Sequence, residues 1–245
     1  MNHDIPPSGP AMPQHPPVEA AIPEKLDTRA LFEALLRSPR GLASRLAEPH
    51  HGALARFLAI ALGSMLIFGL VLGSFAMNEQ LWAAPLKITA GLLISGLICF
   101  PSLYIFSCLA GSRAEAGQVA ALLTGMLALA GVLLLGFAPA VWIFTQATRS
   151  HGFMGFLALT PWLIALLFGL RFLRSAISAT GASVKGPITL WAAIFLLVTL
   201  QMSTSLRPII GRSERFLTDE KKFFLQHWID SAHITLPANP TNSTP

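Results

Sequence analysis

Charge is scarce in this chain of 245 residues. Charged residues make up 12% of the sequence and hydrophobic residues 53%, whereas a typical soluble domain has about 25% charged residues. Soluble core helices carry a polar stripe every three or four residues, but the long apolar runs here carry none. This pattern excludes an ordinary soluble fold. Eight charged residues occur between positions 57 and 205, all between the apolar runs or at their edges: Glu79, Lys87, Arg113, Glu115, Arg149, Arg171, Arg174 and Lys185.

Cysteine and catalytic motifs are scarce as well. The two cysteines, Cys99 and Cys108, lie in one apolar run, where helical geometry separates them by about 13 Å, too far for a disulfide. The sequence contains no H-E-x-x-H, C-x-x-C, P-loop or G-x-S-x-G motif. His151 is the only histidine between the first and last apolar runs. We therefore predict a protein that is not an enzyme and binds no metal or cofactor.

Five apolar runs are present, each close to the roughly 20 residues that span a hydrocarbon core. They predict an all-α, polytopic transmembrane helix bundle of about five spans. Because the connections are short, neighbouring spans should pack antiparallel. The membrane domain covers residues 57–205, with spans at 57–77, 86–110, 119–145, 153–173 and 187–205.

The segments outside this domain are polar or amphipathic. Residues 1–24 are rich in proline and are predicted to be a disordered leader. Residues 206–245 are predicted to hold a second interfacial helix, with an aromatic face near 218–232, and a disordered tail. The first fifty residues contain no apolar signal-peptide core, so the first span is expected to act as its own insertion signal.

Residues 25–56 form an amphipathic segment. Four apolar side chains fall on one helical face: Leu31, Phe32, Leu35 and Leu36. One interpretation is a helix lying in the membrane interface, where Arg37, Arg40 and Arg45 contact lipid phosphates. The other is a helix packed on the protein's own cytoplasmic loops. The pattern favours neither.

The net charge of +5 fits basic residues beside spans that face the cytoplasm. No basic stripe interleaved with aromatic residues is present, so nucleic-acid binding is not expected. Without the basic C-terminal tail, the positive residues near the span ends favour a cytoplasmic N-terminus and a C-terminus outside. The lipid bilayer is the expected partner, and no feature specifies an oligomeric state.

The spans contain several features with two possible meanings. Pro101, Pro139 and Pro161 are candidate kinks that either line a cavity or aid packing. Gly69 and Gly73 form a G-x-x-x-G for close helix approach, within the chain or between copies. Lys87, one residue into its span, is expected to extend its ammonium group to the interface. Aromatic belts are predicted at Trp82, Trp142, Trp162, Trp191 and Trp228.

Two stretches are similar to a known family. Leu35-Leu36-Arg37-Ser38-Pro39-Arg40, then Leu46-Ala47-Glu48-Pro49 and the first span, resemble the beginning of bacterial Yip-type membrane proteins, which are related to Rab-interacting proteins. Gly111, Gln118 and the third span up to Pro139 resemble that family's loop and span pattern. The resemblance implies five spans, a cytoplasmic N-terminus and a C-terminus across the membrane, and it places the chain in a bacterial inner membrane. The acidic motifs through which eukaryotic members are linked to GTPases are not evident here.

Two functions fit these observations. The first is a non-enzymatic scaffold, related to membrane trafficking, that organises a partner protein or local lipid through its N-terminal segment. The alternative is a passive conduit, or a permease-like component, for a small neutral or lipidic solute, with Pro101 as its hinge. Intramembrane ionisable residues, the usual mark of ion-coupled transport, are absent from the span centres.

Overall fold

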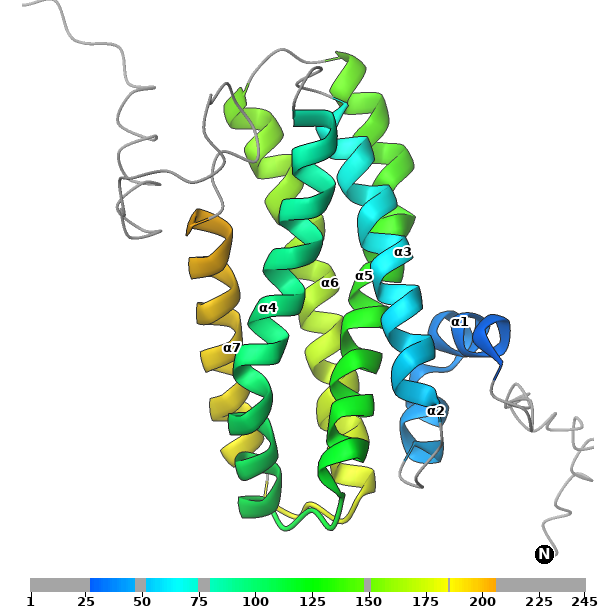
Figure 1. Cartoon of the computed structure of the whole chain (residues 1–245), viewed down its shortest axis with the longest axis vertical. Coiled ribbons are helices and arrows are strands. Elements are labelled where there is room, and N and C mark those ends of the chain that lie inside the picture. Colours follow the sequence, from blue (N-terminus) through cyan, green and yellow to red (C-terminus); the bar gives the residue numbers. More distant parts are fainter. Residues whose placement is uncertain (1–26, 47–51, 75–79, 148–150, 185, 206–245) are drawn as a thin grey trace, which may run out of the picture.

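The computed structural model describes residues 27–46, 52–74, 80–147, 151–184 and 186–205. Within these ranges every regular element is an α-helix. Two short helices, α1 (Thr28–Arg37) and α2 (Pro39–Arg45), precede five long ones. These are α3 (Ala53–Gly73), α4 (Gln80–Leu109), α5 (Ala116–Ala147), α6 (His151–Ala179) and α7 (Gly186–Ser205). Figure 1 shows the long helices side by side, with α1 and α2 beside one end of α3.

Helices α3, α4, α5 and α6 each contain a segment long and apolar enough to cross a membrane. The corresponding segment of α7, Gly186–Met202, is shorter but also apolar. In lipid, a helix satisfies its backbone hydrogen bonds internally, which an irregular chain cannot do. The predicted all-α bundle is confirmed, and about five spans agree with it. The chain is therefore a multi-pass integral membrane protein.

Helix α5 is the centre of the bundle. It packs against α3 on one side and α6 on the other, while α4 packs against α3 and α7. Two thirds of the apolar window of α5 is buried within the protein, against about two fifths or less for the other spans. Small residues let the neighbouring backbones approach α5 closely. A Cβ built on Gly131 would lie 3.3 Å from the Ala61 carbonyl oxygen, and one on Gly169 would lie 3.0 Å from that of Met126.

The helix ends differ from the predicted spans by up to six residues. Helix α4 begins at Gln80 and includes Pro85, before the predicted start at position 86. Helix α6 runs to Ala179, past the predicted end at 173, because the exposed Arg171 and Arg174 lower the hydropathy without breaking the helix. Helix α3 begins at Ala53 and ends at Gly73. Hydropathy marks what is apolar, whereas hydrogen bonding determines where a helix ends. The predicted leader, C-terminal helix and tail lie outside the described residues.

Ser38 divides the amphipathic segment into α1 and α2. The side chain of Asp27 accepts a hydrogen bond from the Thr28 amide at 2.9 Å and caps α1. Pro39 then starts α2, a position where its missing amide hydrogen costs nothing. The two helices therefore follow from local sequence signals.

The candidate packing motif Gly69–Gly73 lies on α3, and both glycines are buried. A Cβ on Gly69 would collide with the backbone of Pro85 in α4 and lie 3.0 Å from its nitrogen. Gly69 therefore takes part in a contact between α3 and α4 of the same chain. The atoms that this Cβ would meet are the Cα, nitrogen and Cβ of Pro85, so the two helices cross here with their backbones close together.

Gly69→Ala should separate α3 from α4 and destabilise the fold by about 1–3 kcal/mol, the usual cost of overpacking. The matched control is Gly63→Ala in the same helix, where a Cβ would meet nothing within 4 Å. The measurement is the unfolding temperature in mild detergent, followed by tryptophan fluorescence. Equal unfolding temperatures for the two variants would contradict the close crossing.

Candidate functional site

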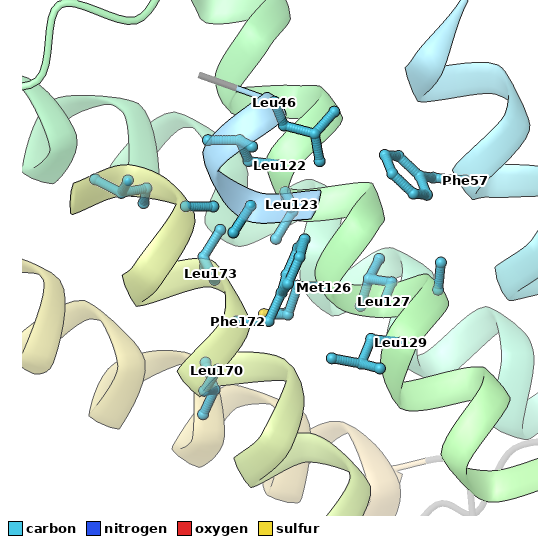
Figure 2. Close-up of a cluster of buried hydrophobic side chains, with 14 of the residues drawn as sticks. Leu46, Phe57, Leu122, Leu123, Met126, Leu127, Leu129, Leu170, Phe172 and Leu173 are labelled. Carbon is cyan, nitrogen blue, oxygen red and sulfur yellow. The ribbon is translucent and has the colours of Figure 1, made fainter. Parts of the chain in front are cut away.

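The candidate site is the end of the bundle where α1 and α2 dock. Leu31, Leu35 and Leu42 are almost completely buried and belong to the same apolar cluster as Phe57 of α3 and Phe172 of α6. Figure 2 shows Leu46, which follows α2, at the edge of a cluster of side chains from α3, α5 and α6. Because α2 packs against α6 and α1 packs against α3 and α5, the two short helices are built into the bundle.

One polar contact anchors this unit to α5. The side-chain amide of Gln118 donates to the Leu46 carbonyl oxygen at 2.9 Å. Leu46 closes α2, and Gln118 is in the first turn of α5. A carbonyl at a helix end has no partner within the helix, so Gln118 satisfies it and also determines where α2 sits along the bundle.

The apolar face of α1 therefore packs on the protein itself, but on the transmembrane helices rather than on loops. Leu36 is an exception to the predicted face. Its side chain is 55% exposed, whereas Leu35 beside it is 1% exposed. Successive residues point about 100° apart on a helix, so Leu36 falls at the rim of the buried face and remains outside the core.

Most of the charge in the described residues lies at this end. Eight arginines are found on α1, α2, the start of α3, the α4–α5 connection and the last part of α6, together with three carboxylates. Figure 1 shows the α4–α5 connection and α2 towards one end of the long helices, with α1 beside the lower half of α3. The arginines are Arg29, Arg37, Arg40, Arg45, Arg56, Arg113, Arg171 and Arg174, and the acidic residues are Asp27, Glu33 and Glu115.

The candidate headgroup-binding residues Arg37, Arg40 and Arg45 are all exposed on the outer side of α1 and α2. The guanidinium Nε of Arg37 lies 3.1 Å from the Glu33 carboxylate, and both side chains are more than half exposed. An exposed pair of this kind contributes about 0.2–1 kcal/mol, so another anion can compete for Arg37. Helices α1 and α2 thus carry exposed arginines on one side, while their opposite side is packed on the bundle.

The candidate kink prolines lie in different surroundings. Pro101 and Pro139 are exposed in α4 and α5, and Pro161 is buried in α6. All three are inside continuous helices. The conduit hypothesis therefore gains no support from a broken helix at Pro101.

Trp191 was expected in an aromatic belt, but the structure buries it completely. Its indole Nε1 donates to the Cys99 carbonyl oxygen at 3.1 Å and to Ser102 Oγ at 3.2 Å, both in α4. Its ring also stacks on Phe195, with centroids 5.1 Å apart. An indole N–H buried in an apolar core needs an acceptor. Trp191 therefore joins α7 to α4, and a membrane anchor is the wrong interpretation for this residue.

Lys87, predicted to extend its ammonium group to the interface, is only 3% exposed in α4, at the end opposite the arginines. Its side chain is thus packed among neighbouring helices. Two residues further on, Thr89 Oγ1 is buried without a hydrogen-bond partner. Trp142 is 53% exposed, as a belt residue should be, and Trp162 is half-buried.

Within the described residues, no group of three or more His, Cys, Asp or Glu side chains is placed to hold a metal ion. Comparison with known proteins finds no matching family model, no matching curated protein and no matching solved structure. The arrangement of the chain's own residues is thus the basis for a functional proposal.

Leu42→Ala should loosen α2 by removing a fully buried side chain, a change that typically costs about 2–5 kcal/mol. We expect trypsin to cut after Arg40 and Arg45 at least several times faster than in the wild type. Leu36→Ala is the matched control, because that side chain is exposed. If both variants are cut at the wild-type rate, α2 is not held by this core.

Trp191→Phe should remove the indole hydrogen bonds while leaving most of the ring in place. The expected loss is about 1 kcal/mol of stability, visible as a lower unfolding temperature in detergent. Trp142→Phe, at an exposed position, serves as the control and should leave the temperature unchanged. A larger loss from Trp142→Phe would contradict the assigned role of Trp191.

Proposed function

We propose that this integral membrane protein is a non-enzymatic scaffold that organises anionic lipid, or a partner protein, at its arginine-bearing end. The observation that carries the proposal is the charge asymmetry. Eight arginines and three carboxylates gather at one end, and the arginines of α1 and α2 are exposed on helices whose inner faces are buried. A fixed array of exposed cations at the membrane interface attracts anionic headgroups.

The same asymmetry supports an orientation. Positive residues collect on the cytoplasmic side of membrane proteins, so we propose that the arginine-bearing end faces the cytoplasm. The N-terminus then lies in the cytoplasm, and an odd number of spans puts the C-terminus outside. A bacterial inner membrane, whose lipids include anionic phosphatidylglycerol, and a Yip-type relationship both fit this proposal.

Point substitutions test the proposal better than a deletion. Removing residues 25–48 would also remove Leu31, Leu35 and Leu42 from the core, so a lost partner would not report on the charges. Arg37, Arg40 and Arg45 are exposed, so their heads can be changed while the buried face stays intact.

The triple variant Arg37→Gln/Arg40→Gln/Arg45→Gln should retain less phosphatidylglycerol than the wild type in native mass spectrometry. Each exposed arginine near an anionic surface contributes about 1 kcal/mol, so the affinity should fall by about 100-fold at low salt. The corresponding triple lysine variant keeps the charge and should bind as the wild type does. Ser44→Ala, on the same exposed side of α2, controls for surface substitution.

Equal retention of phosphatidylglycerol by the glutamine variant and the wild type would refute lipid organisation by these arginines. Retention of phosphatidylcholine equal to that of phosphatidylglycerol would refute a role for headgroup charge. If lipid retention is unchanged but a co-purifying protein is lost, the scaffold acts on a protein partner instead.

A further inference from the structure

The connection between α4 and α5 and the connection between α6 and α7 are paired by a reciprocal exchange of hydrogen bonds. The Arg113 amide donates to the Thr180 carbonyl oxygen at 3.1 Å, and the Ser183 amide donates to the Ala110 carbonyl oxygen at 3.0 Å. In each connection, the residue two after a glycine donates to the residue before the other glycine. Contacts in which i meets j and j meets i are the mark of a two-fold axis.

The numbering of the two hairpins agrees with this symmetry. A single offset of 70 residues relates the two helix ends (109 and 179), the two following helix starts (116 and 186) and the two glycines (111 and 181). Both glycines have positive φ, 90° and 98°, and each amide donates back to the carbonyl three residues earlier, at 2.9 and 3.2 Å. The two connections therefore share one backbone design.

Burial along α4 and α6 repeats with the same offset. Ser95 and Ala165, Cys99 and Gly169, and Leu103 and Leu173 are buried in both helices. The matching exposed pairs are Leu97 and Leu167, Ile98 and Phe168, and Leu109 and Ala179. The contacts between the two hairpins repeat as well, because α4 packs on α7 and its counterpart α6 packs on α5.

The two hairpins differ where α3 is bound. Leu190, Ile194 and Leu197 of α7 are exposed, whereas their counterparts in α5, Ala120, Thr124 and Leu127, are half-buried or buried. Gly131, on the same side of α5, lies against Ala61 of α3. Helix α3 on the first hairpin accounts for this difference. Further differences are that α3 packs on α4 and that α2 packs on α6.

We propose that α4–α5 and α6–α7 are two copies of one helical hairpin related by a two-fold axis along the bundle, and that their paired connections form a clasp. The clasp holds the two copies together at the arginine-bearing end, whereas at the opposite end the copies are joined through the chain between Ala147 of α5 and His151 of α6. Repeats related by an axis along the membrane normal are known in transporters. The proposal is independent of the lipid-binding function.

Hydrogen bonds define the clasp. They fix its partners, including the hydroxyls of Ser112 and Thr180, 2.6 Å apart. The apolar packing between the helices is non-directional, so these hydrogen bonds determine which residues of the two connections face each other.

Two pairs of spin labels test this device in the full chain in nanodiscs, on a Cys99→Ala/Cys108→Ser background. Leu109→Cys/Ala179→Cys reports on the clasp end and Leu86→Cys/Phe156→Cys on the far end. In each pair the two positions are related by the offset of 70 residues, and all four sites are exposed. We expect one narrow distance distribution at the clasp end, and the far-end distribution should stay unchanged when the clasp is broken. A broad distribution at positions 109 and 179 in the otherwise unchanged protein would overturn the clasp.

Breaking the clasp should broaden the distribution at positions 109 and 179 at least twofold. Gly111→Ala/Gly181→Ala does this by placing side chains at positive φ, and the milder Ser112→Ala/Thr180→Val serves if the glycine variant does not fold. Gly117→Ala/Gly186→Ala is the matched control, since a Cβ there meets nothing within 4 Å. An unchanged width in the broken clasp would show that the connections are ordinary helix caps.

A double-mutant cycle separates a clasp from two independent caps. If the two connections are in contact, the effects of Gly111→Ala and Gly181→Ala on the unfolding temperature should be non-additive. The double variant should then lower the unfolding temperature by clearly less than the sum of the two single decreases. If the effects simply add, the connections act independently and the clasp is refuted. The Ser112→Ala and Thr180→Val pair should show the same coupling at smaller size.

Discussion

The close approach of helix backbones around α5 is the constraint on which the rest of the fold depends. Lipid tails are as apolar as leucine, so hydrophobicity alone gives helices in a bilayer little reason to associate. Contact between backbones replaces that driving force here. Gly131 allows α3 to approach α5 closely, Gly169 allows α6 to approach α5, and Gly69 allows α4 to approach α3. The α1–α2 unit then fills the space beside α3 and α6, where Leu42 and Phe172 belong to one cluster. The position of the exposed arginines follows from this packing.

The same arrangement connects stability with the proposed function. Arginines on a free amphipathic helix would move with the lipid surface. Here the buried faces of α1 and α2 and the Gln118 contact with Leu46 hold the helices at a set place on the bundle. The clasp between the two connections lies at the same end and keeps the neighbouring helix ends together. The packing of α1 and α2 and the proposed clasp thus both act on the arginine-bearing end.

Hydropathy was sufficient to predict the all-α bundle and the approximate position of each long helix, because a span needs a long apolar segment wherever it packs. Hydropathy does not predict which side chains of a span face the interior of the bundle. Trp191 is buried because Cys99 and Ser102 of another helix offer acceptors, a contact 92 residues away in the chain that no local pattern encodes. Leu36 was predicted on the buried face for the same reason, since burial depends on neighbouring helices. The hairpin repeat is not evident from the sequence, because Gly111 and Gly181 are among few identities between the two proposed copies.

Orientation relative to the membrane is the most direct test of the account, since the arginine-bearing end must face the cytoplasm for its charges to meet the proposed lipids. Single cysteines at Glu115 and Val184, one in each connection and both exposed, can be labelled with a membrane-impermeant thiol reagent in a background without Cys99 and Cys108. The account predicts labelling in inverted vesicles and none in intact spheroplasts. Labelling of both positions in intact spheroplasts would contradict it.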